Sequence, residues 1–149
     1  MPVSTAIVWL KTASAILMIG FGLMFAIAAY PPTSGVADLF VDLLFWPLDG
    51  AQSLAAPETR IILAIGGGIT AGWGVLVWQV ATHLMPSNPA MARHILIRSL
   101  LTWFVIDSTC SMIAGAPINV PANVGFLLMF IWPLLRMART EASAARRLP

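Results

Sequence analysis

The segment RSLLTWFVIDSTCSMIAGAPINVPANVGFLLMFIWPLLR, residues 98–136, carries an arginine at each end and no basic residue between them. Only 37 residues, 99–135, separate the two arginines, and most of them are apolar. A membrane-spanning helix needs about 20 predominantly apolar residues, with a range of about 17–25. Two spans would use almost the whole segment, so the chain has to turn sharply near Pro117 and Pro121. The segment therefore predicts two transmembrane helices joined by a minimal turn.

The composition of the whole chain is also typical of a membrane protein. Of its 149 residues, 59% are hydrophobic and 9% are charged, whereas soluble domains carry roughly 25% charged residues. Backbone polar groups must be paired within lipid, so the spans are expected to be helices. We predict an all-α integral membrane protein, a single domain of four transmembrane helices in an antiparallel bundle. The expected spans are 12–30, 61–84, 99–116 and 120–135.

Basic residues are distributed unequally between the two sides of such a bundle. Arg60 alone falls on the side of the first loop, and seven basic residues fall on the other side: Lys11, Arg93, Arg98, Arg136, Arg139, Arg146 and Arg147. An excess of Lys and Arg marks the cytoplasmic side. Both termini, including the tail 137–149, are therefore expected in the cytoplasm and residues 31–60 outside. Compactness and charge asymmetry together indicate a bacterial inner membrane.

The first loop contains the segment GVADLFVDLLFWPLDG, residues 35–50. Apolar residues at 36, 39, 40, 43 and 44 recur with helical spacing, and Asp38 and Asp42 share the opposite face. We predict an amphipathic helix over about 36–46 that lies on the outer membrane surface and ends before Pro47. Such a helix would cap the bundle, or alternatively act as a lid or a docking site for a partner.

The second span contains the glycine-rich segment IGGGITAGWG, residues 65–74. Its small residues form two rows with a spacing of four: Gly68 and Gly72, and Gly66, Thr70 and Gly74. Small residues at this spacing let helices approach closely in lipid. One row is expected to pack against Gly22 and Ala26 of the first span. The other would then be free to contact another membrane subunit or a second copy of the chain.

Asp107 is the acidic residue of the third span. It lies nine residues from Arg98 and eight from Gly115, about 13 and 12 Å along a helix, so we expect it near the middle of the membrane. An ionised aspartate there costs on the order of 2.5–3.5 kcal/mol. We therefore expect a neutral carboxyl group that faces the bundle interior and donates a hydrogen bond to a neighbouring helix. A proton or ion pathway and contact with a bound ligand are the alternatives.

Asn119 and Asn123 lie at the turn that follows. Their amides are expected to bond carbonyl groups freed by the turn, or alternatively to form a polar vestibule above Asp107. Asn123 is 13 residues from Arg136, about 6 Å farther from the inner surface than Asp107. The candidate intramembrane polar site consists of Asp107, Ser108, Ser111, Asn119 and Asn123.

The other chemistry-bearing residues predict neither a cofactor nor a catalytic group. Cys110 is the only cysteine, which excludes a CxxC site. His83 and His94 flank the short inner loop, where a haem between helices is geometrically possible, but we expect no haem or metal. Ser/His/Asp sets and paired carboxylates at one depth are lacking. A basic stripe with interleaved aromatic residues is also lacking, so no nucleic-acid partner is expected.

In size and number of spans the chain resembles the small bacterial DoxX-like membrane proteins. This resemblance is one of architecture and implies a four-helix membrane fold, with no residue role attached. The chain lacks the Arg- and Glu-rich helix motifs of the small trimeric glutathione-linked membrane enzymes.

The sequence favours a non-catalytic accessory or assembly subunit that acts through helix packing. Its expected partners are the lipid bilayer and other membrane subunits, or a second copy bound through the second span. A small oligomeric channel or ion- or proton-coupled transporter using Asp107 is the alternative. A membrane-embedded enzyme of unknown reaction is the third interpretation, without a nominated nucleophile.

Overall fold

The computed structural model describes the backbone of residues 1–145 and the side chains of residues 1–137. Arg146 and Arg147, part of the predicted cytoplasmic tail, lie outside the described residues. Residues 1–145 contain helices and no strand. Four helical segments are long and apolar enough to cross a membrane: Val3–Ile27, Pro57–Leu84, Pro89–Ile113 and Asn119–Met137. The prediction of an all-helical chain with four such helices is confirmed.

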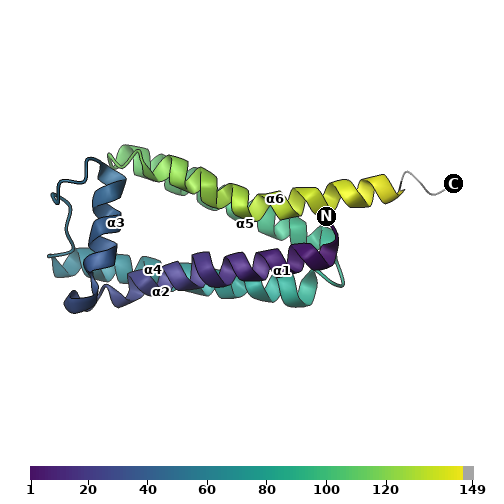
Figure 1. Cartoon of the computed structure of the whole chain (residues 1–149), viewed down its shortest axis with the longest axis horizontal. Helices are drawn as coiled ribbons and strands as arrows, with labels where there is room; N and C mark the ends of the chain where they lie inside the picture. Colours follow the sequence, from purple (N-terminus) through teal and green to yellow (C-terminus); the bar gives the residue numbers. More distant parts are fainter. Residues whose placement is uncertain (146–149) are drawn as a thin grey trace.

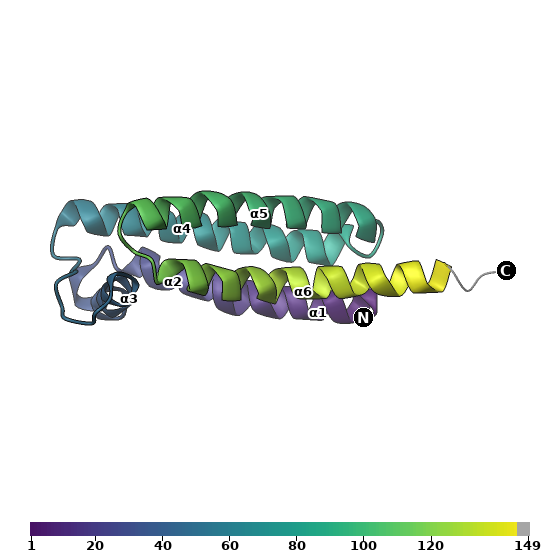
Figure 2. The same ribbon diagram turned by 90° about the horizontal axis from the view of Figure 1, so that it is seen from above.

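The long helices form two layers that meet at one end. In chain order the elements are α1 (Val3–Ala13), the π-helix η1 (Ser14–Gly20), α2 (Phe21–Ile27), the 3-10 turn η2 (Pro31–Thr33), α3 (Gly35–Phe45), α4 (Pro57–Gln79), the π-helix η3 (Val80–Leu84), α5 (Pro89–Ile113) and α6 (Asn119–Ala145). Figure 1 shows α1, α2 and α4 in one layer, α5 and α6 in the other, and α3 across the end where the layers diverge. The view from above places α5 over α4 and α6 over α1 and α2 (Figure 2).

α5 begins earlier in the sequence than its hydropathy predicted. The helix begins at Pro89, ten residues before Ser99, because the side-chain oxygen of Asn88 accepts a hydrogen bond from the backbone N–H of Met91 at 3.0 Å. Asparagine is a favourable N-cap, and proline is well suited to the first helical position. Asp107 lies 18 residues from the start of α5 and six residues from its end.

The main apolar core lies at the end where the two layers meet. All four long helical segments contribute buried side chains to it: Ala6, Leu10, Ala13, Met18, Val77, Ala81, Met85, Ala92, Leu96, Leu100, Phe130, Leu134 and Met137. Near α3 the packing is reduced to a small cluster of Ala28, Ala37 and Leu54. The molecule is therefore a wedge, tightly packed at the end of the chain's N-terminus and loosely packed beneath α3.

Two glycines bring the backbones of α2 and α4 into direct contact. A Cβ atom on Gly22 would lie 2.5 Å from the backbone nitrogen of Ala71, and one on Gly67 would lie 2.6 Å from that of Ala26. Neither position can carry a side chain at this separation. Gly22 and Ala26, the partners expected on the first span, are the residues that α4 meets here.

The row that packs inside the chain differs from the rows that the sequence predicted. It consists of Gly67, Ala71 and Gly74, since a Cβ on Gly74 would lie 2.6 Å from the side chain of Met18. Gly74 was expected, whereas Gly67 was missed because it lies between the two predicted rows. Of the other predicted positions, Thr70 is partly buried, and the space around Gly66, Gly68 and Gly72 is open.

A hydrogen bond to a carbonyl group freed by Pro133 joins the two layers. Proline has no N–H, so the carbonyl oxygen of Met129, four residues earlier in α6, loses its helical partner. The indole Nε1 of Trp9 in α1 donates to this oxygen at 2.8 Å. Backbone polar groups have no alternative partner in a lipid environment. The bond therefore satisfies α6 and attaches it to α1.

α3 is held by the loop that follows it. Its two acidic side chains accept hydrogen bonds from backbone N–H groups, Asp38 from Leu54 and Asp42 from Gly50 at 3.1 Å. The guanidinium of Arg60 donates to the carbonyl oxygen of Leu54 at 2.7 Å. The acidic face predicted for this helix is thus covered by the chain's own loop, and Asp42 is buried.

We predict opposite effects for two neighbouring glycine substitutions in α4. Gly67→Ala should lower the free energy of unfolding by roughly 1–3 kcal/mol, because the new methyl group forces α2 away. Gly68→Ala, which meets open space, should be neutral or stabilising by up to about 1 kcal/mol through helix propensity. Denaturant unfolding in mixed micelles measures both. Equal effects of the two substitutions would contradict the α2–α4 contact.

A second prediction concerns the carbonyl group of Met129. Trp9→Phe should destabilise the protein by about 1–3 kcal/mol, because a polar backbone group loses its partner. In a Pro133→Ala background the same substitution should cost much less, since alanine restores the N–H that proline lacks. A double-mutant cycle on unfolding free energies provides the measurement, and strictly additive effects would rule out the proposed link.

Candidate functional site

The five polar residues proposed as a site lie together between α5 and α6. Asn119 Nδ2 donates to Asp107 Oδ2 at 2.9 Å and to Ser111 Oγ at 2.8 Å. Asn123 Nδ2 donates to the same carboxyl oxygen and to Ser108 Oγ at 3.2 Å. The carboxyl group thus accepts two amide N–H groups from the neighbouring helix, whereas the sequence led us to expect it to donate.

The turn between α5 and α6 sets this geometry. α5 ends in a Schellman motif, in which the N–H of Ala116 donates to the carbonyl oxygen of Ser111 at 2.9 Å. Gly115 has φ +80°, a conformation that glycine adopts without strain. α6 then begins at Asn119, so that Asn119 and Asn123, one helical turn apart, face Asp107.

The polar cluster forms one wall of a cavity of about 430 Å³ between the two layers. Asp107, Asn119, Asn123 and Thr70 are its polar lining residues. α3 covers the cavity with Phe40, and six aromatic rings line it in total: Phe21, Phe25, Phe40, Trp73, Trp103 and Phe126. Small-molecule sites typically have volumes of about 300–1,000 Å³, mostly apolar walls and a few polar groups. The cavity has the size and lining of such a site.

The aromatic rings that line the cavity form two groups. Phe21, Phe25 and Phe40 pack edge to face near α3, with ring centroids 4.5 and 4.9 Å apart for the pairs that include Phe21. Trp103 lies between Trp73 and Phe126, at centroid distances of 5.8 and 5.2 Å. The second group closes the cavity toward the apolar core, because Phe126 continues to the buried Phe130.

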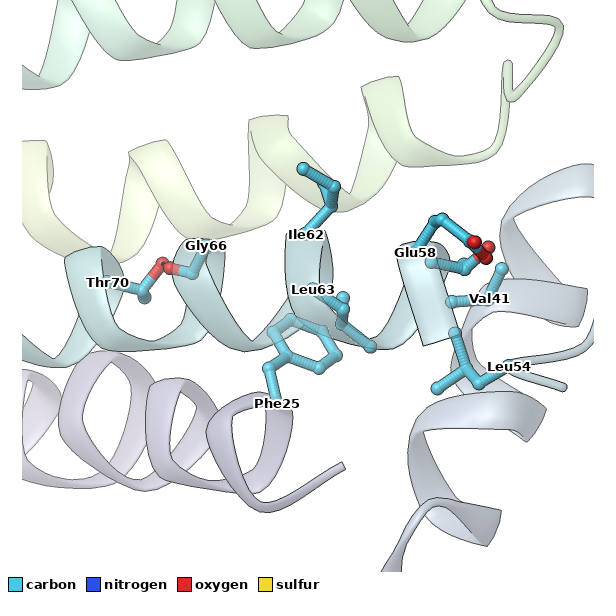
Figure 3. A pocket seen from close by; sticks show the side chains of 9 residues that line it. Phe25, Val41, Leu54, Glu58, Ile62, Leu63, Gly66 and Thr70 are labelled. Atoms are coloured by element: carbon cyan, nitrogen blue, oxygen red, sulfur yellow. Dashed lines mark hydrogen bonds between the residues drawn. The ribbon is translucent and has the colours of Figure 1, made fainter. Parts of the chain in front are cut away.

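A second cavity of about 610 Å³ adjoins the first along α4 (Figure 3). The two share the lining residues Phe25, Val41, Leu63 and Thr70. The hydroxyl group of Thr70 donates to the carbonyl oxygen of Gly66 at 2.8 Å, so its proton is already engaged. Figure 3 shows Glu58 at the α3 end of this cavity, beside Val41. Asp107 thus lines one of two adjoining cavities and Glu58 the other.

Several oxygen atoms of the polar cluster have no donor within the described part of the chain. Both hydrogen bonds of the Asp107 carboxyl group are accepted by Oδ2, which leaves Oδ1 without a hydrogen bond among the described residues. The side-chain oxygens of Asn119 and Asn123 likewise accept no hydrogen bond, since both amides act through Nδ2. No basic side chain lines either cavity among the described residues. The cluster is therefore rich in acceptors and carries a carboxyl group.

The histidines and the cysteine lie apart from this cluster. His83, in η3, and His94, in α5, are both exposed. Cys110 is exposed on α5. In the described part of the chain, no three His, Cys, Asp or Glu side chains are grouped as metal ligands would be.

Comparisons with protein-family models, with curated proteins and with solved structures find no match for the chain. The function has to be inferred from the chain's own residues. The α5–α6 polar cluster and its aromatic cavity are the features on which such an inference can rest.

We predict energetic coupling between Asp107 and Asn123. Each of Asp107→Leu and Asn123→Leu removes one partner of an interhelical hydrogen bond, whereas the double variant removes both. The coupling free energy should be roughly 0.6–2 kcal/mol, the range found for such bonds between membrane helices. Unfolding in mixed micelles gives the values. Thr109→Leu is the control, because Thr109 is exposed and should act additively with Asn123→Leu. Additivity in both cycles would exclude a stabilising role for the cluster.

Proposed function

We propose that the chain is a multi-pass protein of the bacterial inner membrane that acts as a non-catalytic accessory or assembly subunit through helix packing. The four long apolar helices support insertion into a membrane. The excess of Lys and Arg on one side supports cytoplasmic termini. The exposed apolar residues of α3, Val36, Leu39 and Leu43, support a position at the outer membrane surface.

The open face of α4 is the observation that carries this proposal. Gly68 and Gly72 lie one turn apart with no atom within 4 Å of an added Cβ. Residues at helical spacing continue the face in both directions, and all of them are exposed: Ile61, Ile65, Val75 and Gln79. We call these six residues the open α4 face. It lies on the side of α4 away from the row that contacts α2.

Two properties of the open α4 face favour a protein partner over lipid. Apolar side chains gain little from leaving lipid, so membrane helices associate where small residues permit close backbone contact. Gly68 and Gly72 provide such a surface. Gln79 adds a side-chain amide, which can form a hydrogen bond across a helix pair. We infer that a helix of another membrane subunit, or of a second copy of this chain, packs here.

Bulky substitutions on the open α4 face should abolish this association. The full-length protein is purified from its native membrane in mild detergent, and its partners and mass are determined by mass spectrometry. The wild type should co-purify with a defined partner or as a defined oligomer, and Gly68→Ile/Gly72→Ile should be found alone. Gly125→Ile in α6 is the matched control, because its surroundings are also open. A wild type that purifies alone, or a double variant that keeps its partner, would refute the proposal.

A channel or an ion- or proton-coupled transporter using Asp107 is the second candidate. Trp73 and Trp103 line both the Asp107 cavity and a separate space of about 440 Å³ that includes Arg98, so one ring pair borders both spaces. A continuous polar path would require these rings to separate, and the apolar core lies beyond them. This requirement places the transporter second. A proton or ion flux in liposomes that Asp107→Asn abolishes would reverse the order.

A further inference from the structure

We propose that the cavity beneath α3 binds an amphipathic organic cation, with its ammonium or phosphonium group beside Asp107 and its apolar body among the aromatic rings. This inference goes beyond assembly through the open α4 face, since it concerns cavities lined by other residues of α4 and requires no partner protein. It rests on the charge, the free acceptor atoms and the aromatic lining of the cavity.

The charge that lines the two adjoining cavities is one-sided. Asp107 lines the first and Glu58 the α3 end of the second, and the described residues that line them include no lysine, arginine or histidine. Arg98 lines the separate space that shares only Trp73 and Trp103 with the Asp107 cavity. Two other basic residues have contacts of their own. Arg60 donates to the carbonyl oxygens of Leu54 and Ala55, and the Lys11 amine lies 4.6 Å from the centre of the Trp78 ring. A cationic ligand would supply the missing positive charge.

The free acceptor atoms specify where that charge would lie. Oδ2 of Asp107 is occupied by two amide N–H groups, and its position is fixed by α6. Oδ1 of Asp107 has no hydrogen-bond partner among the described residues. In a space walled by apolar groups the effective dielectric constant is low, so a carboxylate attracts a cation more strongly there than in water. An anionic ligand would be repelled for the same reason.

The aromatic rings specify the rest of the ligand. Cations are attracted to the faces of aromatic rings, most strongly to tryptophan, and quaternary ammonium groups are recognised in aromatic cages. Trp73, Trp103 and Phe126 line the same cavity as Asp107 and Asn123, and Trp103 lies one helical turn from Asp107 on α5. The three phenylalanines near α3 provide further apolar surface in this cavity. A small hydrated metal ion would leave both groups of rings without a contact.

Binding to the full-length protein in nanodiscs of zwitterionic lipid tests this inference. The probes are benzyltrimethylammonium and the larger tetraphenylphosphonium, with neopentylbenzene as the uncharged analogue that matches benzyltrimethylammonium in shape. Isothermal titration calorimetry against empty nanodiscs gives the affinities. We expect saturable binding of at least one cation, and neopentylbenzene should bind about tenfold more weakly or worse.

The variants assign the binding to the cavity. Asp107→Asn should weaken cation binding about tenfold or more, whereas Asp107→Glu, which keeps the charge, should bind much more tightly than Asp107→Asn. Asp49→Asn removes the same charge from the exposed loop and should leave binding unchanged. Trp103→Leu should weaken binding without a change in charge. Helix content by circular dichroism confirms that each variant is folded.

Three results would overturn the inference. The first is equal affinity for benzyltrimethylammonium and neopentylbenzene, which would indicate an apolar cavity filled by lipid chains. The second is unchanged cation binding in folded Asp107→Asn. The third is the lack of saturable binding of both cations to folded wild type. Gly68→Ile/Gly72→Ile should bind the cations as the wild type does, so a failure of assembly and a failure of binding are distinguishable.

Discussion

The hydrogen bond from Trp9 to the carbonyl oxygen of Met129 ties the two helical layers to each other. It exists because Pro133 removes the N–H that would otherwise bond this carbonyl. The apolar core surrounds the same region, with Leu10 of α1 and Leu134 of α6 buried in it. Closing the wedge at this end leaves the other end free to diverge. The cavity beneath α3 thus lies away from the contacts that hold the two layers together.

The turn between α5 and α6 fixes the positions of the polar groups of this hairpin. A Schellman motif at Gly115 fixes the direction in which the chain returns. The return places two amides on one carboxyl oxygen, so Asp107 is held by its own hairpin and needs no third helix. This arrangement stabilises the pair of helices and leaves the second carboxyl oxygen available. A structural role and a binding role for Asp107 are thus compatible.

Much of the helical architecture follows from the sequence, because apolar length and charge are local properties. The four apolar segments and the helix around Asp38 and Asp42 are visible in hydropathy and spacing alone. The start of α5 was misjudged because Arg93 and His94 interrupt its apolar pattern, although Asn88 and Pro89 form a recognisable helix start. Asn88 and Pro89 indicate the true start of the helix, whereas hydropathy indicates a later one.

The site was only partly predictable for a related reason. Asp107 and its two asparagines stand out because they are polar residues in apolar surroundings. The aromatic lining does not, since phenylalanine and tryptophan are ordinary in a membrane helix, and the six rings come from five elements. The packing row on α4 was equally hidden: three consecutive glycines at 66–68 offer three possible faces, and only the path of α2 selects Gly67.

The contact between Gly22 and Gly67 has a mechanical consequence. Main-chain atoms cannot rearrange as side chains do, so α2 and α4 form a stiff wall whose separation is already at its minimum. The opposite wall contacts this one chiefly through the Trp9 indole and the apolar core, and through the N-terminal amine of Met1, which donates to the carbonyl oxygen of Arg136 at 3.2 Å. We expect the space between the two layers to widen or narrow when the α5–α6 hairpin tilts as a rigid unit. The hinge of this motion would lie beside Pro133, where α6 lacks one of its own hydrogen bonds and bends most easily.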